Sequence, residues 1–225
     1  MKRQGIPSIK HLTISTVLLA AAFLLSLAFF IVLVHEVLGE GEDQFDTRVF
    51  DFFSNNSSAF WVSFFRILTF FGSVYFLLPA YLILVVFLFV RRGTSDAIAV
   101  VIISISSSLA SFGLKVIFSR PRPVLPFIEK IRNYSFPSGH ALLSFIFFSI
   151  LIYLLFTTRL EKKWKWILSI FFIVFALGVG ISRVILRYHY ATDVIGGFCL
   201  GFSWVLLSFW IQRKIERRVQ MKKAT

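Results

Sequence analysis

The sequence predicts an all-α integral membrane protein with six transmembrane helices, cytoplasmic N and C termini, and one short additional helix that is extracytoplasmic or interfacial. Of its 225 residues, 57% are hydrophobic and 29 are phenylalanine, and the mean hydropathy is +0.82. Soluble domains usually contain about 45–50% apolar residues. The excess falls in long runs, and about 20 apolar residues are enough to cross the hydrocarbon core as a helix. We therefore expect a single domain over residues 1–225, helical except for the loop 36–57 and the short basic tails.

Each predicted span is a long apolar run. In chain order, the six runs are 12–34, 73–90, 97–118, 141–158, 166–182 and 193–211. The first run follows three basic residues, as a signal peptide would, but it is longer than the roughly 7–15 apolar residues of a signal peptide and no small-residue cleavage site follows it. We therefore expect it to be retained as an anchor. The apolar stretch Ser58–Gly72 is interrupted by Arg66, which predicts an interfacial or re-entrant helix that leads into the second span.

The net charge of +13 is unevenly divided between the two sides of the predicted bundle. With six spans, both tails and the loops 91–96 and 159–165 lie on one side, which holds 15 of the 24 basic residues but only three of the 11 acidic ones. Lys and Arg collect on the cytoplasmic side of membrane proteins, so this side is predicted to face the cytoplasm. The charge therefore sets the orientation. Because it is split among short loops, it does not predict nucleic-acid binding.

Three predicted loops face the other side of the membrane. The acidic loop 36–57 is either a cover or partner surface, or a plain solvated loop. Loops 119–139 and 182–192 and the adjoining span ends carry a set of polar and ionisable residues: Lys115, Arg120, Arg122, Ser138, His140, Arg183, Arg187, His189 and Asp193. Basic residues at span ends often anchor a helix by snorkelling. Their concentration on the side that should be poor in arginine instead favours a functional site.

Two short sequences in these loops indicate phosphate chemistry. His189 and Asp193 are four residues apart, so in a helix they would share one face, either as a catalytic pair or as a structural ion pair. Pro137, Ser138 and Gly139 suit the start of a helix, whose free N–H groups attract phosphate. The next residue, a histidine, would then lie in the first helical turn, beside the bound anion.

Three cationic side chains complete the expected phosphate site. Lys115, Arg122 and Arg183 supply N–H donors, and arginine forks match phosphate oxygens. Mg²⁺ and Ca²⁺ need several oxygen ligands, usually carboxylates, and the two polar loops offer only Glu129 and Asp193. We therefore expect no metal ion and no other cofactor.

These residues form three motifs. Lys115 to Pro123 reads K-x6-RP, Pro137 to His140 reads PSGH, and Ser182 to Asp193 reads SR-x5-H-x3-D. Together, in this order and without a departure, they resemble the three-part motif of the type-2 phosphatidic acid phosphatase superfamily, which contains membrane lipid phosphatases and soluble haloperoxidases. The motifs cover residues 115–193, and the six-span layout extends the resemblance over the chain.

The resemblance implies metal-independent hydrolysis of a phosphomonoester or pyrophosphate through a phosphohistidine. It implies that His189 is the nucleophile, that Asp193 orients and activates it, and that His140 protonates the leaving oxygen. The phosphoryl oxygens would be held by the cations and by the start of the helix after the second motif: Lys115, Arg122, Ser138, Gly139 and Arg183. Arg120 and Arg187 lie outside the motif positions and are expected to add positive potential.

The expected enzyme is a lipid phosphatase of the bacterial plasma membrane that acts at the extracytoplasmic face. We favour phosphatidylglycerol phosphate as substrate, with undecaprenyl pyrophosphate as the alternative and phosphatidic acid also open. A transporter or lipid-binding sensor and a haloperoxidase are the competing classes. The expected partners are the lipid phosphate and the bilayer, with no nucleic acid; the oligomeric state is left open, a monomer included. Gly197 and Gly201 predict close helix contact, within one chain or in a dimer.

Overall fold

The chain forms an all-helical bundle in a computed structural model that describes residues 9–39, 44–56, 58–123 and 133–224. The helices, in order, are α1 (Ile9–Gly39), α2 (Gln44–Asn56), α3 (Ala59–Phe70), α4 (Val74–Arg91), α5 (Thr94–Phe118), α6 (Gly139–Phe156), α7 (Lys162–Ile185) and α8 (Ala191–Ala224). Among the described residues, six stretches are long and apolar enough to cross a membrane, and α3 and α4 together make one of them, Ala59–Arg91. The predicted six-span, all-α membrane fold is confirmed.

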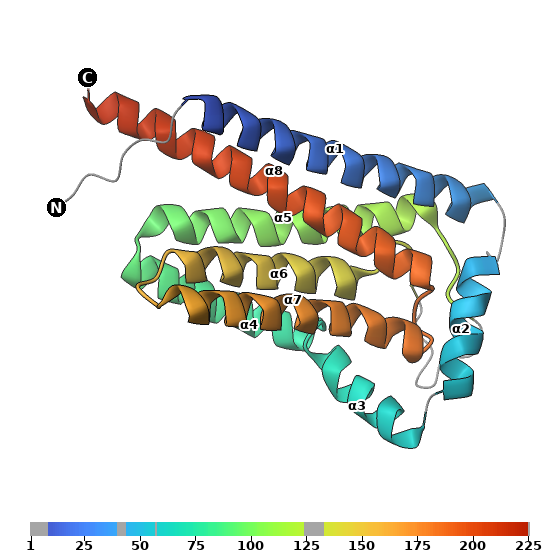
Figure 1. Ribbon diagram of the computed structural model, residues 1–225. Helices are drawn as coiled ribbons and strands as arrows, with labels where there is room; N and C mark the ends of the chain where they lie inside the picture. The colour runs from blue at the N-terminus through green and yellow to red at the C-terminus, as the bar shows by residue number, and fades with distance from the viewer. Residues whose placement is uncertain (1–8, 40–43, 57, 124–132, 225) are drawn as a thin grey trace.

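The long helices run lengthwise beside one another (Figure 1). α6 lies at the centre, because it packs against α5, α7 and α8, and α1 lies along α8. α2 crosses one end of the bundle (Figure 1). α3 is inclined to the long helices and packs on α7. At this end α5 and α7 stop and α6 and α8 begin, so we call it the site end. At the opposite end α4 and α6 stop and α5 and α7 begin. We call this the basic end.

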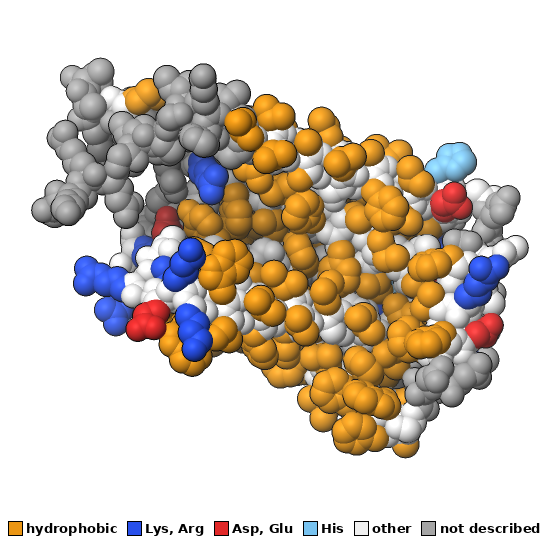
Figure 2. Space-filling model, viewed as in Figure 1, with side chains coloured by type: hydrophobic (Ala, Val, Ile, Leu, Met, Phe, Trp, Pro, Cys, Tyr) orange, Lys and Arg blue, Asp and Glu red, His pale blue; other side chains and the backbone are white. Residues whose placement is uncertain are grey.

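Apolar side chains cover the outside of the bundle as well as its core. Figure 2 shows a broad hydrophobic band between the two ends, with Lys and Arg side chains gathered beside the basic end. Leu25, Ile83 and Ile117 are each more than 70% exposed, which a water-soluble surface would not tolerate over so wide an area but which lipid tails satisfy. Many of the phenylalanines instead pack inside, as Phe148 does between Phe172 and Phe175.

Two glycines allow α8 to approach α6 closely. A Cβ atom on Gly197 would lie 2.7 Å from the carbonyl oxygen of Ser138, and one on Gly201 would lie 3.2 Å from that of Leu142. The close contact predicted from these two glycines is therefore made within the chain. It fixes the start of α6 against the first turns of α8.

The predicted separation of the 58–72 segment from the second span is visible as a break at Phe71–Ser73 between α3 and α4. Two predictions about non-helical segments are wrong. The segment 36–57, expected as a loop, contains the end of α1 and the whole of α2, while residues 40–43 and 57 lie outside the described residues. The basic C-terminal tail, expected outside the helical domain, continues α8 to Ala224.

Candidate active site

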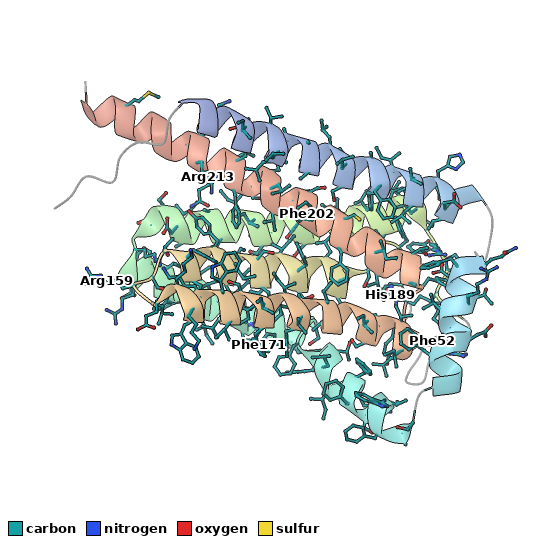
Figure 3. All side chains as sticks on the ribbon, viewed as in Figure 1. Phe52, Arg159, Phe171, His189, Phe202 and Arg213 are labelled. Atoms are coloured by element: carbon teal, nitrogen blue, oxygen red, sulfur yellow. The ribbon has the colours of Figure 1, made fainter. Side chains whose placement is uncertain are left out.

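The three motifs meet at the site end, next to α2. His189 lies there, whereas Arg159 and Arg213 lie at the opposite end (Figure 3). Each motif reaches this place at a helix end: the first runs from the last turn of α5 into the loop after it, the second begins α6, and the third joins α7 to α8. Arg120 and Asp193, which are 73 residues apart in the sequence, are thereby hydrogen-bonded to each other.

The turn after α7 places His189. Arg187 adopts the left-handed region with φ of 55°, and the amides of Tyr188 and His189 both donate to the carbonyl oxygen of Arg183, at 2.9 and 3.1 Å. A left-handed residue with such bonds is a usual way to end a helix. It turns the chain back, so that His189 points into the bundle with only 2% of its surface exposed.

Two contacts of the His189 ring favour one tautomer. Nδ1 lies 3.2 Å from Oδ2 of Asp193, and Nε2 lies 3.2 Å from Nη1 of Arg122. A guanidinium group has only donors, so Nε2 must accept a hydrogen bond from Arg122. The proton of the neutral ring is then on Nδ1, which donates to Asp193. Nε2 keeps a lone pair directed toward the cations, as a nucleophile requires.

The electrostatic environment favours this neutral ring. Burial, followed by the positive charges of Arg122, Lys115 and Arg183, lowers the pKa of His189 well below its ordinary value of 6.5. At neutral pH the imidazole is therefore uncharged, and its Nε2 lone pair accepts the hydrogen bond from Arg122.

Asp193 is held by the start of α8. Its Oδ2 accepts a hydrogen bond from the backbone amide of Tyr190 at 3.0 Å, so that the third residue of the helix caps its first turn. The sequence interpretation placed His189 and Asp193 on one face of a helix, but His189 lies before α8 begins. The pair forms because the capping carboxylate turns back toward the preceding loop.

Arg122 is held in place by hydrogen bonds to oxygen atoms of Tyr188 and Asn133. Its Nη1 donates to the carbonyl oxygen of Tyr188 at 2.6 Å, and its Nε donates to the backbone and side-chain oxygens of Asn133, at 2.9 and 3.1 Å. Its Nη2 also donates to the side-chain oxygen of Asn133. Asn133 was not singled out in the sequence, and only its position in the folded loop shows that it orients this guanidinium.

Lys115 lies at the end of α5, beside the start of α6. Its Nζ donates to the carbonyl oxygens of Tyr134 and Ser135, at 2.9 and 3.0 Å. A Cβ atom on Gly139 would lie 3.9 Å from Cε of Lys115, so this cation and the first turn of α6 border the same space.

Ser138 stabilises the start of α6 through two hydrogen bonds. The Ser138 amide donates to the backbone carbonyl oxygen of Asp193 at 2.9 Å, and its Oγ accepts from the amide of Ala141 at 3.5 Å. The amides of Gly139 and His140 lie in the first turn, where intrahelical partners do not exist. Phosphate contact by Ser138 and Gly139 stays a prediction, based on the free amides of the first helical turn.

His140 lies between the start of α6 and the α3–α4 junction. A Cβ atom on Gly72 would lie 3.0 Å from Cδ2 of the His140 ring and 2.4 Å from a methyl group of Val179. A side chain at position 72 would therefore require Val179 or His140 to shift.

Arg183 closes the cluster from α7. Its Nη1 donates to Oγ1 of Thr69 at 2.8 Å, and its guanidinium carbon lies 4.2 Å from the ring centroid of Tyr188. Its buried Nε has no hydrogen-bond partner among the described residues. A buried unpaired guanidinium donor is costly, so this group is suited to an anionic ligand. Thr69, on α3, was missed in the sequence because nothing near it marks a functional position.

The structure corrects the expectation for Arg120. Rather than adding positive potential, its charge is matched by Asp193, at 2.7 Å, and by Asp46 of α2, at 2.9 Å. Arg187 instead lies with its guanidinium carbon 5.7 Å from the ring centroid of Phe50. Asp46 was missed because it lies in the acidic segment that was expected to be a loop.

No group of three or more His, Cys, Asp or Glu side chains suited to a metal ion occurs among the described residues. The carboxylates of Asp46 and Asp193 are both bonded to Arg120. The donors left for a ligand are N–H groups, so the chemistry of this cluster fits an anion.

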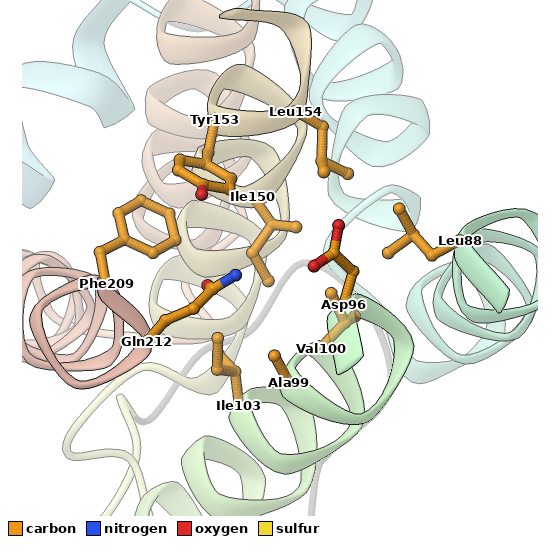
Figure 4. A pocket seen from close by; sticks show the side chains of 10 residues that line it. All are labelled: Leu88, Asp96, Ala99, Val100, Ile103, Ile150, Tyr153, Leu154, Phe209 and Gln212. Atoms are coloured by element: carbon orange, nitrogen blue, oxygen red, sulfur yellow. The ribbon is translucent and has the colours of Figure 1, made fainter. Parts of the chain in front are cut away.

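A separate small cavity lies near the basic end (Figure 4). It encloses about 10 Å³, which is about the room that one water molecule needs. Its lining is Leu88, Asp96, Ala99, Val100, Ile103, Ile150, Tyr153, Leu154, Phe209 and Gln212. It has no cationic lining residue, and none of the motif residues reaches it.

Comparisons with known proteins identify a family and several relatives of this chain. Residues 96–217 match the model of the PAP2 superfamily. Phosphatidylglycerophosphatase B of Bacillus subtilis is 33% identical over 151 residues, which are 67% of this chain and 74% of that protein. An undecaprenyl-diphosphatase of Sulfolobus acidocaldarius is 31% identical over 210 residues, which are 90% of this chain and 97% of that protein.

The fold agrees as well. The crystal structure of a transmembrane PAP2-type phosphatidylglycerolphosphate phosphatase from Bacillus subtilis matches with a TM-score of 0.79 and 28% identity, over 86% of this chain and 96% of that one. The expected resemblance is confirmed by sequence and by fold. The chain therefore belongs to the PAP2 superfamily and is a lipid phosphatase with six membrane spans.

Proposed function

We propose that this protein hydrolyses a lipid phosphate at the extracytoplasmic face of the membrane, without a metal ion, through a phosphohistidine formed on His189. The observation that carries the proposal is the environment of the His189 ring. Asp193 holds the proton on Nδ1, and Nε2 faces Arg122, at 3.2 Å on each side. A neutral, oriented nucleophile beside several fixed cations is what attack on a phosphate requires.

In the first step, Nε2 of His189 attacks the phosphorus atom and the bond from phosphorus to the leaving oxygen breaks. Arg122 releases Nε2 and donates to a phosphoryl oxygen instead, together with Lys115 and Arg183. His140, protonated in the complex, gives its proton to the leaving oxygen. The ring of His189 becomes cationic as the nitrogen–phosphorus bond forms, and the carboxylate of Asp193 stabilises it.

In the second step, a water molecule attacks the phosphorus atom of the phosphohistidine. His140 takes a proton from this water, the nitrogen–phosphorus bond breaks, and the neutral ring of His189 is restored. Inorganic phosphate then leaves. The protein supplies position and positive charge for the equatorial oxygens throughout, which is most of what phosphoryl transfer needs.

The proposed orientation follows from the distribution of charge. Arg159 and Arg213 lie at the end opposite to His189 (Figure 3). Most of the other basic residues belong to the two tails and to the loops 91–96 and 159–165, which the sequence places on the same side as Arg159 and Arg213. The basic end is expected in the cytoplasm, which puts the site end outside it. A plasma-membrane location in a bacterial cell is part of this proposal.

We favour phosphatidylglycerol phosphate as substrate and phosphatidylglycerol as product. The Bacillus subtilis relatives named for this reaction match this chain in sequence and in fold. Undecaprenyl pyrophosphate is the second candidate, because the Sulfolobus acidocaldarius undecaprenyl-diphosphatase matches over 97% of its length. Phosphatidic acid is a third substrate to assay.

The test uses the purified full chain in detergent with a chelator present. Phosphate release is measured from each of the three lipids, and rapid acid-free quenching with ³²P-labelled lipid is used to trap an acid-labile phosphoprotein. His189→Asn should abolish both signals, while His35→Gln, at an exposed position on α1, should leave both unchanged. Undiminished turnover by H189N, or complete loss of turnover on chelation, would contradict the proposal.

A cysteine-labelling experiment tests the orientation separately. A single cysteine introduced at the exposed position Asp51 of α2, in a Cys199→Ser background, should react with a membrane-impermeant maleimide in intact cells. Reaction only after lysis would place the site in the cytoplasm.

A further inference from the structure

Asp46 joins α2 to the start of α8 by a fully buried carboxylate. Its Oδ1 accepts a hydrogen bond from the backbone amide of Thr192 at 2.9 Å, and its Oδ2 accepts one from Oγ1 of Thr192 at 2.6 Å. The side chain is 0% exposed. A residue from outside the membrane-spanning helices thus reaches the first turn of the helix that carries Asp193.

Arg120 connects this carboxylate to the proposed catalytic pair. Its Nη2 donates to Oδ2 of Asp46 at 2.9 Å, and its Nη1 donates to Oδ1 of Asp193 at 2.7 Å. Burial alone would lower the pKa of Arg120, but the charges of Asp193 and Asp46 outweigh burial and raise it, so the guanidinium stays charged. Arg120 is itself 6% exposed, and solvent therefore screens these charges little.

The chain of contacts runs through the two oxygens of Asp193. One oxygen faces Arg120, and the other lies 3.2 Å from Nδ1 of His189. If Arg120 had Asp193 as its only anion, the pair would be neutral and little negative charge would remain to stabilise a cationic His189 ring. With Asp46 present, the group of Asp46, Arg120 and Asp193 carries one net negative charge. A cationic ring on His189 brings this buried group to neutrality.

We propose that Asp46 is a positioning residue for phosphoryl transfer: it neutralises Arg120, so that the charge of Asp193 remains available to the phosphorylated His189. This inference rests on the proposed function, and it adds α2 to the machinery of the same site. Asp46 contacts neither His189 nor the N–H donors proposed for phosphate, so it acts through Arg120 and Asp193. Its effect is expected on the chemical step and not on the binding of phosphate.

A purely structural role would look similar in a static view, because the same bonds hold α2 on the bundle. The distinction lies in the charge of Arg120. In Asp46→Asn the shape is retained but the guanidinium is left with Asp193 as its only carboxylate. In the double variant D46N/R120Q both charges are removed, and the negative charge of Asp193 is again directed to His189. A structural role predicts that the second change adds damage, whereas the charge role predicts that it restores turnover.

The experiment measures kcat and KM of the full chain with phosphatidylglycerol phosphate in detergent micelles, or with whichever of the three lipids it hydrolyses fastest, and the inhibition constant of inorganic phosphate. D46N should lower kcat by about tenfold or more, equivalent to about 1.4 kcal/mol of barrier, with KM and the phosphate inhibition constant within about twofold of wild type. The kcat of D46N/R120Q should be at least about threefold higher than the kcat of D46N. Asp51→Asn, at an exposed position on the same helix, is the matched control and should behave as wild type.

Three results would overturn the inference: D46N with the kcat of D51N, a double variant no faster than D46N, or a D46N protein whose kcat and phosphate affinity fall together. D46N leaves part of a buried charge unpaired and could fail to fold, so the double variant is also judged alone. Its kcat should stay within about tenfold of wild type, and a kcat as low as that of Asp193→Asn would contradict the proposal. None of these results touches the proposed function, which fails instead if H189N retains turnover.

Discussion

Nη1 of Arg122 lies 3.2 Å from Nε2 of His189, on the edge of the ring opposite to Asp193. This relationship gives the imidazole one donor and one acceptor as neighbours, so a single tautomer satisfies both. In the proposed reaction a phosphoryl group takes the place of Arg122 beside Nε2 of His189. Substrate binding therefore exchanges a guanidinium–imidazole contact for a guanidinium–phosphate contact, which is stronger because it is between opposite charges.

Asp193→Asn should reverse the tautomer of His189. The amide presents either an N–H group or a weaker acceptor to Nδ1, and in the first case the ring proton moves to Nε2, where it blocks attack. We expect kcat to fall by about 10⁴-fold, the loss known when the orienting carboxylate of a catalytic histidine is replaced by an amide. The measurement is phosphate release at saturating lipid, with H189N as the baseline. A variant that keeps a tenth of wild-type kcat would contradict the assignment of the tautomer.

The pH dependence of stability should report the buried His189. Its pKa is lowered in the folded protein, so between that lowered value and the ordinary value of 6.5 the unfolded chain binds a proton that the folded chain does not. Stability must then fall as the pH falls below about 6.5, and His189 should contribute no pH dependence above that value.

The thermal unfolding midpoint in detergent, measured at pH 7.5 and at pH 5, checks this dependence. The wild-type midpoint should fall more over this interval than the midpoint of H189N, which carries the same other ionisable groups. Equal decreases in the two proteins would show that His189 is not the group responsible.

Gly197→Ala should damage both stability and activity. The new Cβ atom would lie 2.7 Å from the carbonyl oxygen of Ser138, which is backbone and cannot rotate away. The start of α6 would be pushed from α8, and the bond from the Ser138 amide to the carbonyl oxygen of Asp193 would lengthen. We expect a lower unfolding midpoint and at least about a tenfold loss of kcat/KM, since displacements of about 1 Å in a catalytic site can cost about 100-fold.

Gly113→Ala is the control for that variant. Gly113 lies within α5, and a Cβ atom there would meet nothing within 4 Å. Alanine favours the helix by about 0.5–1 kcal/mol over glycine, so the midpoint of G113A should stay the same or rise. If G197A were as stable and as active as G113A, the packing of α8 on α6 would differ from the one described.

Thr69→Val should weaken the phosphate site from the side of α3. The variant removes the hydroxyl oxygen that accepts from Nη1 of Arg183 at 2.8 Å, and leaves a second unpaired donor on a buried guanidinium. A hydrogen bond to a charged group contributes about 1.5–3 kcal/mol, so kcat/KM should fall by about tenfold or more. Ser63→Ala, exposed on the same helix, should leave kcat/KM unchanged. Equal values for T69V and S63A would show that Thr69 does not hold Arg183 in the working enzyme.

The sequence was sufficient for the six spans and for the side chains that surround His189. Long apolar runs identify membrane helices, and residues such as Lys115 and Arg183 are marked by being charged at span ends. The sequence could not identify the partners that hold them. Asp46 and Arg120 are 74 residues apart, and only the way α2 folds across the site end brings them to 2.9 Å. The left-handed turn at Arg187, which removes His189 from any helix, also has no signal in its residue type.

The site end brings together two helix starts, those of α6 and α8, each with unpaired amides and a partial positive charge. At α8 the protein supplies its own anion, because the carboxylate of Asp46 already receives the Thr192 amide. The start of α6 is the other helix start at this end, and its first-turn amides can bind an anionic ligand. Under the proposed function, a phosphate of the substrate therefore meets the first-turn amides of α6, while the Thr192 amide of α8 stays bonded to Asp46.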